Sequence, residues 1–390
     1  MSHFLTEEQE MLKELCAQIA REKILPVRAE YDESGEFPWD VVKVMAASDI
    51  YGVYIPEEYG GFGGGVMEMC IATEELSKVC GGISLAFAAS ALGAYPILLF
   101  GSDEQKKKYL PDIAAGKKLA AFGLTEANAG SDAGAVETRA ELDGDEYVLN
   151  GTKQWITNGG EAEIYTVVAR TSKGTGIRGM SCLIVEKDTP GFTFGKKEDK
   201  MGIRGSATRE LVFQDCRVPK ENLLGREGTG FVVAMRTFDK SRPGVAAQAV
   251  GIAQGAFDEA AKYARQREQF GQPIGSFQAI QFMLADMATS IEAARALVYH
   301  SARVVDSGAK DIAKISAMAK VFASDVAMKV TTDAVQVLGG YGYMKEYPVE
   351  KMMRDAKITQ IYEGTNQIQR SIIGSAVIKE SAAKERSEKS

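Results

Sequence analysis

The 390-residue chain is 45% apolar and can bury one large core or two to three cores of ordinary domain size, which excludes a disordered or small disulfide-stapled protein. Its formal net charge of −7 provides no basic surface for phosphates, so we expect no nucleic-acid partner. The five cysteines show no Cys-x-x-Cys spacing and only two histidines are present, so we expect no metal site, no disulfide framework and no Ser-His-Asp triad.

Residues 1–120 are predicted to form an N-terminal helical domain. The pattern Thr6-x-x-Gln9 is typical of a capping box at the start of a helix, and helical stretches follow, separated by loops such as 56–65. The sequence does not open with a basic segment followed by an apolar one, so we expect a cytoplasmic protein.

One apolar segment of this domain, 83–100, is an uncharged run of 18 residues and is long enough to cross a membrane. It is rich in alanine, it is interrupted by Ser84, Gly93 and Pro96, and it has no basic flank or aromatic belt. Helices that are apolar on all sides are typical of the interior of large proteins. We therefore predict a buried core helix and no membrane span.

Residues 121–230 are predicted to form a β-domain. Asp143-Gly144 and Asn150-Gly151 are typical of hairpin turns, and they bracket a short β-rich run at 147–149. Further β-rich runs, separated by turn residues, stand at 164–169, 181–185 and 211–213.

Residues 231–380 are predicted to form a bundle of long helices. In one of them, apolar residues recur at alternating steps of three and four, which places them on one helix face. These residues are Phe277, Ile280, Leu284, Met287, Ile291, Ala294 and Val298. Residues 381–390 are charged and rich in alanine or serine, and we expect this tail to fray or to be disordered. No Gly-x-Gly-x-x-Gly follows a strand and opens a helix, so a nicotinamide cofactor in a Rossmann domain is not expected.

Five segments resemble the signatures of the acyl-CoA dehydrogenase family, in the family's order and over essentially the whole chain. They are Phe122 to Asp132, Trp155 to Gly160, Arg267 to Gly271, Gln336 to Gly340 and Ile361 to Arg370. The resemblance implies an α+β multidomain fold with an N-terminal α-helical domain, a middle β-barrel domain and a C-terminal four-helix bundle. The run from Phe238 to Pro243 is similar to the short- and medium-chain branch, the butyryl-CoA type.

The resemblance implies dehydrogenation of a short- to medium-chain acyl-CoA to the trans-2-enoyl-CoA, as in fatty-acid β-oxidation. This reaction takes a proton from the α-carbon and a hydride from the β-carbon, and because no side chain accepts a hydride, it needs a flavin, here FAD. The family's base corresponds to Glu363, whose pKa burial should raise toward neutral pH. The Glu363 backbone N–H and a ribityl hydroxyl of the flavin would hold the thioester oxygen. Some branches carry the base near Arg242, where Ser241 and Gly244 offer no carboxylate.

The resemblance also assigns a set of residues to FAD. Those expected around the flavin ring are Phe122, Leu124 and Thr125 at the pyrimidine edge, Trp155 over one ring face and Thr157 near N5. Those expected at the pyrophosphate and adenine side are Arg267, Phe270 and Gln278, with Gln336, Val337, Gly339 and Gly340 from a neighbouring subunit, while Thr365 and Gln367 complete the dinucleotide site. In place of the family's usual proline after Glu126 stands Ala127, which we expect the flavin loop to tolerate.

The acyl-CoA side is assigned by the same resemblance. Its residues are Ser131, Asp239, Arg242, Tyr362 and Gly364. The segment 87–95 is similar to the one that lines the acyl pocket in relatives, and Ala94 and Tyr95 suggest a compact apolar cavity for short to medium straight chains. Small branched or cyclic acyl groups stay open, as does the physiological direction of the reaction.

The resemblance implies a homotetramer, or at least a dimer. Electrons are expected to leave to an electron-transferring flavoprotein, simple or bifurcating, because the chain contains no second redox motif. Two alternatives stay open: a relative that passes electrons to oxygen or acts as a monooxygenase, and a non-catalytic CoA- or flavin-binding assembly protein. The presence of Thr125, Thr157 and Glu363 favours the dehydrogenase.

Overall fold

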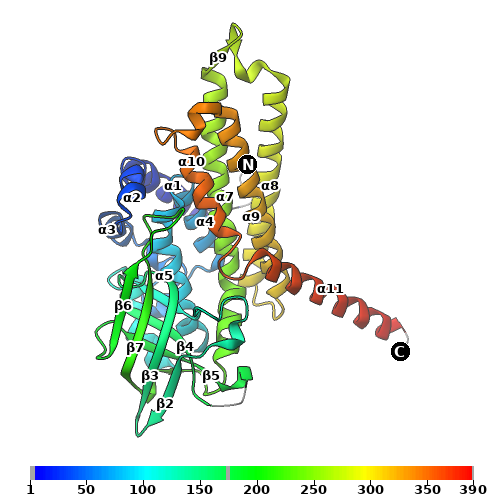
Figure 1. Ribbon diagram of the computed structural model, residues 1–390. Coiled ribbons are helices and arrows are strands. Elements are labelled where there is room, and N and C mark those ends of the chain that lie inside the picture. The colour runs from blue at the N-terminus through cyan, green and yellow to red at the C-terminus, as the bar shows by residue number, and fades with distance from the viewer. Residues whose placement is uncertain (1–4, 173–175, 389–390) are drawn as a thin grey trace.

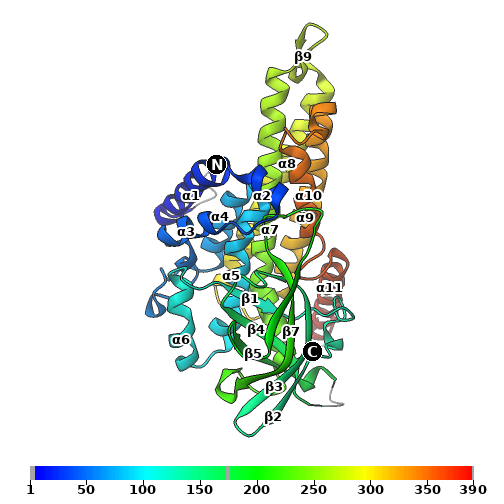
Figure 2. The same ribbon diagram turned by 60° about the vertical axis from the view of Figure 1, so that its left-hand side comes forward.

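The computed structural model describes residues 5–172 and 176–388. Residues 1–4 of the predicted N-terminal domain and residues 389–390 of the predicted tail lie outside this part of the chain. The described chain runs from helices through a sheet to a second set of helices, so the predicted α–β–α order is confirmed (Figures 1 and 2).

In the described part of the chain, six α-helices precede the sheet. They are α1 (Glu7–Ile19), α2 (Arg28–Ser34), α3 (Trp39–Ala47), α4 (Val66–Ser77), α5 (Gly81–Phe100) and α6 (Asp103–Ala114). The predicted capping box is present at α1, where the Thr6 hydroxyl accepts from Gln9 N and the Gln9 side chain accepts from Thr6 N. These reciprocal bonds satisfy backbone groups that would otherwise be unpaired at the helix start.

Helix α5 is the predicted core helix, and it lies between the sheet and the C-terminal helices (Figure 2). Gly93 permits its close approach to the first strand, because a Cβ atom there would lie 2.4 Å from Ala121 N. Among the described residues, α5 is the helix long and apolar enough to cross a membrane, but 72% of its apolar stretch is buried inside the protein. The prediction of a buried core helix is confirmed.

The middle of the chain forms an eight-stranded sheet with the order β6-β7-β3-β2-β4-β5-β8, and β1 pairs in parallel with β4. The strands are β1 (Ala120–Gly123), β2 (Arg139–Asp143), β3 (Glu146–Thr157), β4 (Ile164–Arg170), β5 (Met180–Glu186), β6 (Phe192–Lys197), β7 (Thr208–Pro219) and β8 (Leu223–Leu224). The predicted turn at Asp143-Gly144 joins β2 to β3. The run 211–213 is the middle of the longer strand β7.

The second predicted turn, Asn150-Gly151, is wrong. Strand β3 continues through these residues, and its register against β7 shifts between Leu149 and Gly151, which marks a β-bulge. Gly151 has a φ of 147°, and a Cβ atom there would lie 2.6 Å from Thr138 Oγ1. The glycine therefore serves a close approach within the sheet, and the Asn-Gly pair does not reverse the chain.

The C-terminal helices form an elongated bundle beside the sheet (Figure 1). They are α7 (Gly230–Gln266), α8 (Gln278–Asp306), α9 (Ala313–Leu338), α10 (Val349–Thr359) and α11 (Asn366–Glu388). At the tip of the bundle, the short strands β9 (Glu268–Gln269) and β10 (Gln272–Pro273) join α7 to α8. The predicted apolar face of α8 is buried from Met287 to Val298, whereas Ile280 and Leu284, nearer the tip, are only partly covered.

Helix α11 leaves the bundle as a separate arm (Figure 1). The tail from residue 381 was expected to be frayed or disordered, but the structure continues the helix to Glu388. Alanine, lysine and glutamate are strong helix formers, which accounts for the difference. The side chains of this stretch are exposed, so the helix is not held there by contacts within the described chain.

Candidate active site

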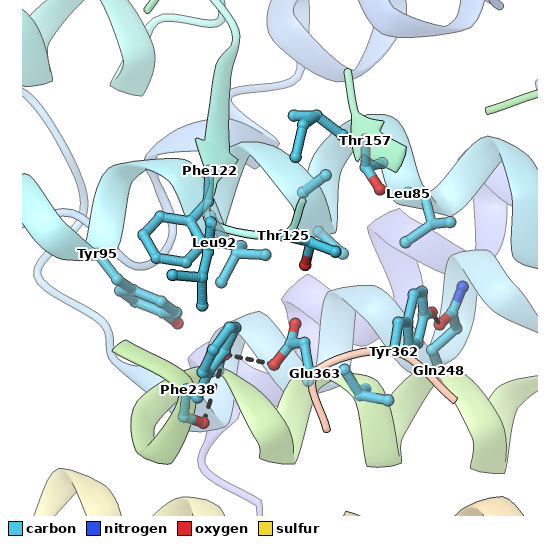
Figure 3. A pocket seen from close by; sticks show the side chains of 18 of the residues that line it. Leu85, Leu92, Tyr95, Phe122, Thr125, Thr157, Phe238, Gln248, Tyr362 and Glu363 are labelled. Atoms are coloured by element: carbon cyan, nitrogen blue, oxygen red, sulfur yellow. Dashed lines mark hydrogen bonds between the residues drawn. The ribbon is translucent and has the colours of Figure 1, made fainter. Parts of the chain in front are cut away.

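A pocket lies where α4, α5 and α7 meet the ends of β1 and β3 and the loop after α10 (Figure 3). Its apolar lining includes Met69, Leu85, Leu92, Phe122, Phe238 and Val245. Its polar side chains include Thr125, Thr157, Ser241, Gln248 and Glu363. Figure 3 shows Glu363 entering from the loop after α10, with the two threonines across the pocket. The pocket thus presents a single carboxylate to a largely apolar space.

The backbone of Glu363 has a left-handed conformation, with a φ of 52°. Arg242 Nε, from α7, donates to the Glu363 carbonyl at 3.3 Å, and Gln369 Nε2, from α11, donates to the same carbonyl at 3.1 Å. The Ser241 hydroxyl donates to Glu363 Oε2 at 2.5 Å. Two helices therefore fix both the backbone and the carboxylate of this residue.

A buried lysine supports the same loop from α9. Lys320 Nζ donates to the Gly364 carbonyl at 2.9 Å and to Asn366 Oδ1 at 2.9 Å. Asn366 opens α11 and in turn donates to Asp325 Oδ1 at 2.7 Å. The Gly364 carbonyl also accepts from Gln369 Nε2 at 2.9 Å. Because the carbonyls of the loop are held in this way, the loop keeps one shape around the pocket.

The acidity of Glu363 is strongly perturbed. Burial of its carboxylate raises the pKa of Glu363 to about 7, against the opposing effects of the Ser241 hydroxyl and of the cations Arg242 and Lys320. Desolvation disfavours the charged form of a carboxyl group, and nearby donors and cations favour it. A group with a pKa near neutral pH can accept a proton from substrate and release it again.

Tyr362 precedes Glu363 and lines the same pocket. Its hydroxyl donates to Gln248 Oε1 on α7, and burial raises the pKa of the phenol well above its usual range, so that it stays neutral. Among the described residues, no acceptor pairs with the backbone N–H of Glu363. This N–H is therefore available to an oxygen atom of a bound molecule.

The opposite side of the pocket is built by the end of β1 and the end of β3. Lys153 Nζ is fully buried and donates to Glu126 Oε1 at 2.6 Å and to the Leu124 carbonyl at 3.0 Å. Gln154 N donates to the Thr125 carbonyl at 2.8 Å. Ala127 lies in a tight turn that Glu126 and Ala129 close with two backbone hydrogen bonds, so the replacement of proline leaves the turn intact.

Trp155 and the two threonines on this side lack partners of their own. Trp155 has a φ of 57° and is 54% exposed, which is unusual for so large an apolar ring. The hydroxyls of Thr125 and Thr157 face the pocket and have no hydrogen-bond partner within residues 5–172 and 176–388. A flat ring and two free hydroxyls form a surface suited to a planar polar ligand.

A second pocket lies at the tip of the bundle, and it gathers four of the other predicted cofactor residues, Arg267, Val337, Gly339 and Gly340. Its lining includes Tyr263, Arg267, Val337, Gly339, Gly340 and Tyr341. The Arg267 guanidinium lies 5.4 Å from the centre of the Tyr341 ring. The structure brings Arg267 and part of the 336–340 segment to one pocket of one chain, because α7 and α9 pack side by side and end at the same tip. The supply of this segment by a neighbouring subunit, which the resemblance implies, stays a prediction.

The remaining residues predicted at this end are exposed. Phe270 is 94% exposed in the β9–β10 turn and has a φ of 53°. Gln278, Gln336 and Gln367 are exposed as well, and Thr365 is half-buried. The structure thus places one group of the predicted FAD residues at the active pocket and another at the tip, while Thr365 and Gln367 lie where α11 begins, beside the Glu363 loop. Gln248 and Tyr263, which line the two pockets, are 15 residues apart on α7, which is about 22 Å along a helix.

The residues predicted on the acyl-CoA side are not all in one place. Asp239 and Arg242 form a buried ion pair on α7, with Nη1 of the arginine 3.1 Å from Oδ1 of the aspartate. Tyr362 and Gly364 lie in the loop around the base, and a Cβ atom at Gly364 would lie 2.8 Å from Gln369 Nε2. Ser131 is exposed in the loop before β2 and does not line the pocket.

Within the predicted acyl segment, one face of α5 lines the pocket. These residues are Ala88, Ala89, Ala91, Leu92 and Tyr95. Phe87 and Ala94 are buried on the other side of the helix and do not line the pocket.

Sequence reasoning missed Ser241 as a partner of the base, and it missed Gln248 and Lys320 altogether. The spacing of Ser241, Val245 and Gln248 on α7 is the one signal that could have found two of them.

The described chain thus has a helix–sheet–helix fold around a largely apolar pocket with one carboxylate, an arrangement suited to an enzyme that takes a proton from an apolar substrate. Family models match the chain in three parts: the acyl-CoA dehydrogenase N-terminal domain at residues 6–117, the middle domain at 121–216 and the C-terminal domain at 228–378. The chain belongs to the acyl-CoA dehydrogenase family. As the sequence predicted, it is an enzyme of that family, an oxidoreductase acting on CH–CH groups.

Three full-length relatives are closely similar. The "Acyl-CoA dehydrogenase, short-chain specific" of Clostridium acetobutylicum is 49% identical over 380 residues, which cover 97% of this chain and 100% of the relative. The structure of butyryl-CoA dehydrogenase from Megasphaera elsdenii is 50% identical with a TM-score of 0.94, covering 96% of this chain and 99% of that one. A chain of a structure on the electron transferring flavoprotein of Acidaminococcus fermentans and flavin-based electron bifurcation is 54% identical with a TM-score of 0.95, covering 97% and 99%. The predicted resemblance to the short-chain, butyryl-CoA type is confirmed.

Proposed function

We propose that the protein is an FAD-dependent dehydrogenase that converts a short- to medium-chain acyl-CoA to the trans-2-enoyl-CoA, with Glu363 as the base. The observation that carries the proposal is the placement of Glu363. Its carboxylate has a pKa near 7, and it faces Thr125 and Thr157 across an apolar pocket. The similarity to short-chain and butyryl-CoA dehydrogenases supports the choice of substrate.

The residues of the active pocket fit a flavin. Trp155 offers a half-exposed indole face, and Thr125 and Thr157 offer unpaired hydroxyls to ring heteroatoms. Phe122 and Leu124 supply the apolar edge of this side. FAD, when bound, would supply the two-electron acceptor for the hydride of the β-carbon, which no side chain can be.

The side chains themselves account for the proton transfer. Glu363 accepts the α-proton, and the apolar lining keeps water away from its carboxylate, which holds its pKa high enough for the task. The free N–H of Glu363 would donate to the thioester oxygen as enolate charge develops there. Ser241, through its hydrogen bond to Oε2, orients the carboxylate.

The pocket at the bundle tip would hold the pyrophosphate and adenine end of an FAD whose flavin end lies in the active pocket of a second copy. Arg267 supplies positive charge, and Gly339 and Gly340 leave space, since a Cβ atom would meet nothing there within 4 Å. The exposure of Phe270, Gln278 and Gln336 supports a covering partner. The assembly is accordingly a homotetramer, or at least a dimer.

Electrons would leave to an electron-transferring flavoprotein. The similarity to a chain of a structure that concerns such a flavoprotein and electron bifurcation supports this partner. The alternative, a relative that passes electrons to oxygen, would need the same base for dehydrogenation, so the two are separated by the acceptor: turnover with oxygen should be much slower than turnover with an artificial dye acceptor.

The test is an anaerobic titration of the purified protein with butyryl-CoA, following the bleaching of the oxidised flavin band. The wild type is expected to be yellow with one FAD per subunit and to bleach. Glu363→Gln keeps the volume of the side chain, but the amide cannot accept a proton. The variant should therefore bind FAD, and its flavin should be reduced roughly a hundred- to ten-thousand-fold more slowly than that of the wild type.

The matched control is Glu141→Gln, an exposed glutamate on β2, which should bleach as the wild type does. A colourless wild type that takes up no FAD, or a Glu363→Gln variant as fast as the wild type, would contradict the proposal.

A further inference from the structure

The far wall of the active pocket carries a polar atom without a partner. Tyr95 is fully buried on α5 and lines the pocket, yet its hydroxyl has no hydrogen-bond partner within the described chain. Buried polar groups are nearly always paired. Figure 3 shows this hydroxyl pointing into the pocket, on the side of Glu363 opposite to Tyr362. An unpaired donor at the wall of a substrate pocket indicates that a substrate atom pairs with it.

The neighbours of Tyr95 hold its ring in place. Tyr54 packs edge-on against it, with ring centres 5.8 Å apart and planes at 65°. The ammonium group of Lys240 lies 5.4 Å from the centre of the ring. Burial raises the pKa of Tyr95 well above its usual range, and the charges of Asp306 and Glu363 act in the same direction. The phenol is therefore neutral at every physiological pH and keeps its proton to donate.

The rest of this wall is small and apolar. Ala88, Ala91 and Leu92 precede Tyr95 on the same face of α5. Met69 fills the space beside Gly244, where a Cβ atom would lie 2.7 Å from the methionine sulfur. The alanine and leucine side chains provide no acceptor for the phenol, and Tyr95 forms the wall beyond them. Because its ring is fully buried, we expect it to stop the acyl chain there.

We propose, on the basis of the proposed function, that Tyr95 determines acyl specificity by closing the pocket and donating a hydrogen bond to an oxygen atom at the far end of the acyl group. The preferred substrate is a short acyl-CoA with a hydroxyl, carbonyl or carboxyl oxygen on its last carbon. A site built to hydrogen-bond such an oxygen discriminates strongly against an analogue that lacks it, because the buried donor is then left unpaired.

The experiment uses the FAD-loaded enzyme and two acyl-CoAs with the same number of heavy atoms, 4-hydroxybutyryl-CoA and pentanoyl-CoA. The rate of anaerobic flavin reduction at low acyl-CoA concentration is measured for each. The wild type should prefer 4-hydroxybutyryl-CoA. Tyr95→Phe removes only the hydroxyl, so the preference should fall roughly tenfold to a hundredfold, with the pentanoyl-CoA rate unchanged or higher.

The matched control is Tyr54→Phe, which also removes a buried hydroxyl without a partner but does not line the pocket. Its substrate preference should equal that of the wild type. A wild type that prefers pentanoyl-CoA, a preference unchanged in Tyr95→Phe, or the same loss in both variants would overturn the inference. A wild type that reduces its flavin with butyryl-CoA but with neither of these two acyl-CoAs would also overturn the inference, whereas failure with butyryl-CoA as well would refute the proposed function.

Discussion

Three residues assigned to catalysis or cofactor binding share an uncommon backbone conformation. Trp155, Phe270 and Glu363 have φ values of 57°, 53° and 52°. The left-handed region is unfavourable for residues with a Cβ atom, at roughly 1–3 kcal/mol each, and it persists only where the surroundings impose it. At Glu363 the donors to its carbonyl, Arg242 and Gln369, impose it. The conformation turns the carboxylate into the pocket while the carbonyl is held by the bundle.

The hydrogen bond from Ser241 should set the pH profile of the reaction. Glu363 works in its deprotonated form, so flavin reduction should be slow below a pH of about 7 and rise as the pH increases through that value. The Ser241 hydroxyl lowers the pKa of Glu363, and Ser241→Ala should therefore move the midpoint of the profile to higher pH.

The measurement is the anaerobic rate of flavin reduction by butyryl-CoA at a series of pH values. Ser301→Ala, at a buried serine on α8 without a hydrogen-bond partner in the described chain, is the control and should leave the midpoint in place. A midpoint for Ser241→Ala at or below that of the wild type would contradict the prediction.

Lys320 is expected to contribute both to the free energy of unfolding and to the pH dependence of flavin reduction. Burial lowers the pKa of Lys320 to about 7, while the charge of Glu363 acts to raise it. Lys320→Met leaves the Gly364 carbonyl and Asn366 Oδ1 without their lysine donor, which should cost roughly 1–3 kcal/mol in the free energy of unfolding. It also removes a cation that lowers the pKa of Glu363, so the pH midpoint of flavin reduction should rise.

Denaturant unfolding and the pH profile test the two effects separately. Lys329→Met, on the exposed face of the same helix, removes only a surface ion pair with Asp333 and should change stability by less than about 1 kcal/mol. A Lys320→Met variant that loses stability without any shift of the midpoint would show that Lys320 is purely structural.

At the scale of elements, periodicity and turn chemistry predicted the helical and β-rich parts well, and they failed where packing decides. The apolar run 83–100 is a core helix, as its composition predicted. Asn150-Gly151 reads as a turn but forms a bulge, because the close approach of Thr138 demands a glycine that no local pattern reveals. The pairing of Ser241 and Lys320 with the loop around Glu363 joins segments more than 40 residues apart, so no single window of sequence contains the signal.

The ion pair between Lys153 and Glu126 should be essential to the side of the pocket formed by β1 and β3. Burial alone would raise the pKa of Glu126, but Lys153 and the backbone N–H groups of Glu137 and Thr138 keep it below its usual range. Lys153→Met leaves a buried carboxylate without its cation and the Leu124 carbonyl without a donor, which should lower the free energy of unfolding by roughly 3–5 kcal/mol.

Thermal or denaturant unfolding of the FAD-free protein measures this loss, and FAD affinity should fall with it because Leu124 and Thr125 lie next to the pair. Lys108→Met, which breaks an exposed pair with Glu186, is the control and should cost less than about 1 kcal/mol. Equal losses in the two variants would mean that the buried pair has no special role.

On the scale of the whole molecule, the assignment of residues to FAD stays a prediction, and their grouping in space could not be read from the sequence. Order along the chain does not reveal that α7 and α9 end at the same tip, where Arg267 and Gly339 line one pocket. What the pattern of motifs could supply was the residue types: an arginine for a pyrophosphate, glycines for close approach and aromatic rings for flat surfaces.

The exposed tip of the bundle is expected to be covered by a second copy of the chain. Phe270 is 94% exposed in the β9–β10 turn, and the partly covered residues Ile280 and Leu284 follow it on α8. Neighbouring apolar side chains that are exposed together in this way are typical of an interface. If a second copy covers the tip and the FAD site spans both copies, Phe270→Ser should weaken the assembly and FAD retention together without unfolding the bundle. Sedimentation velocity should then show a shift toward smaller species, and the flavin absorbance of the purified protein should drop.

The control is Phe62→Ser, at a 60% exposed phenylalanine among the N-terminal helices, which should change neither the assembly nor the flavin absorbance. A Phe270→Ser variant that stays assembled and fully yellow would place the interface elsewhere, and an FAD-saturated, active monomer of the wild type would refute a site shared between two copies.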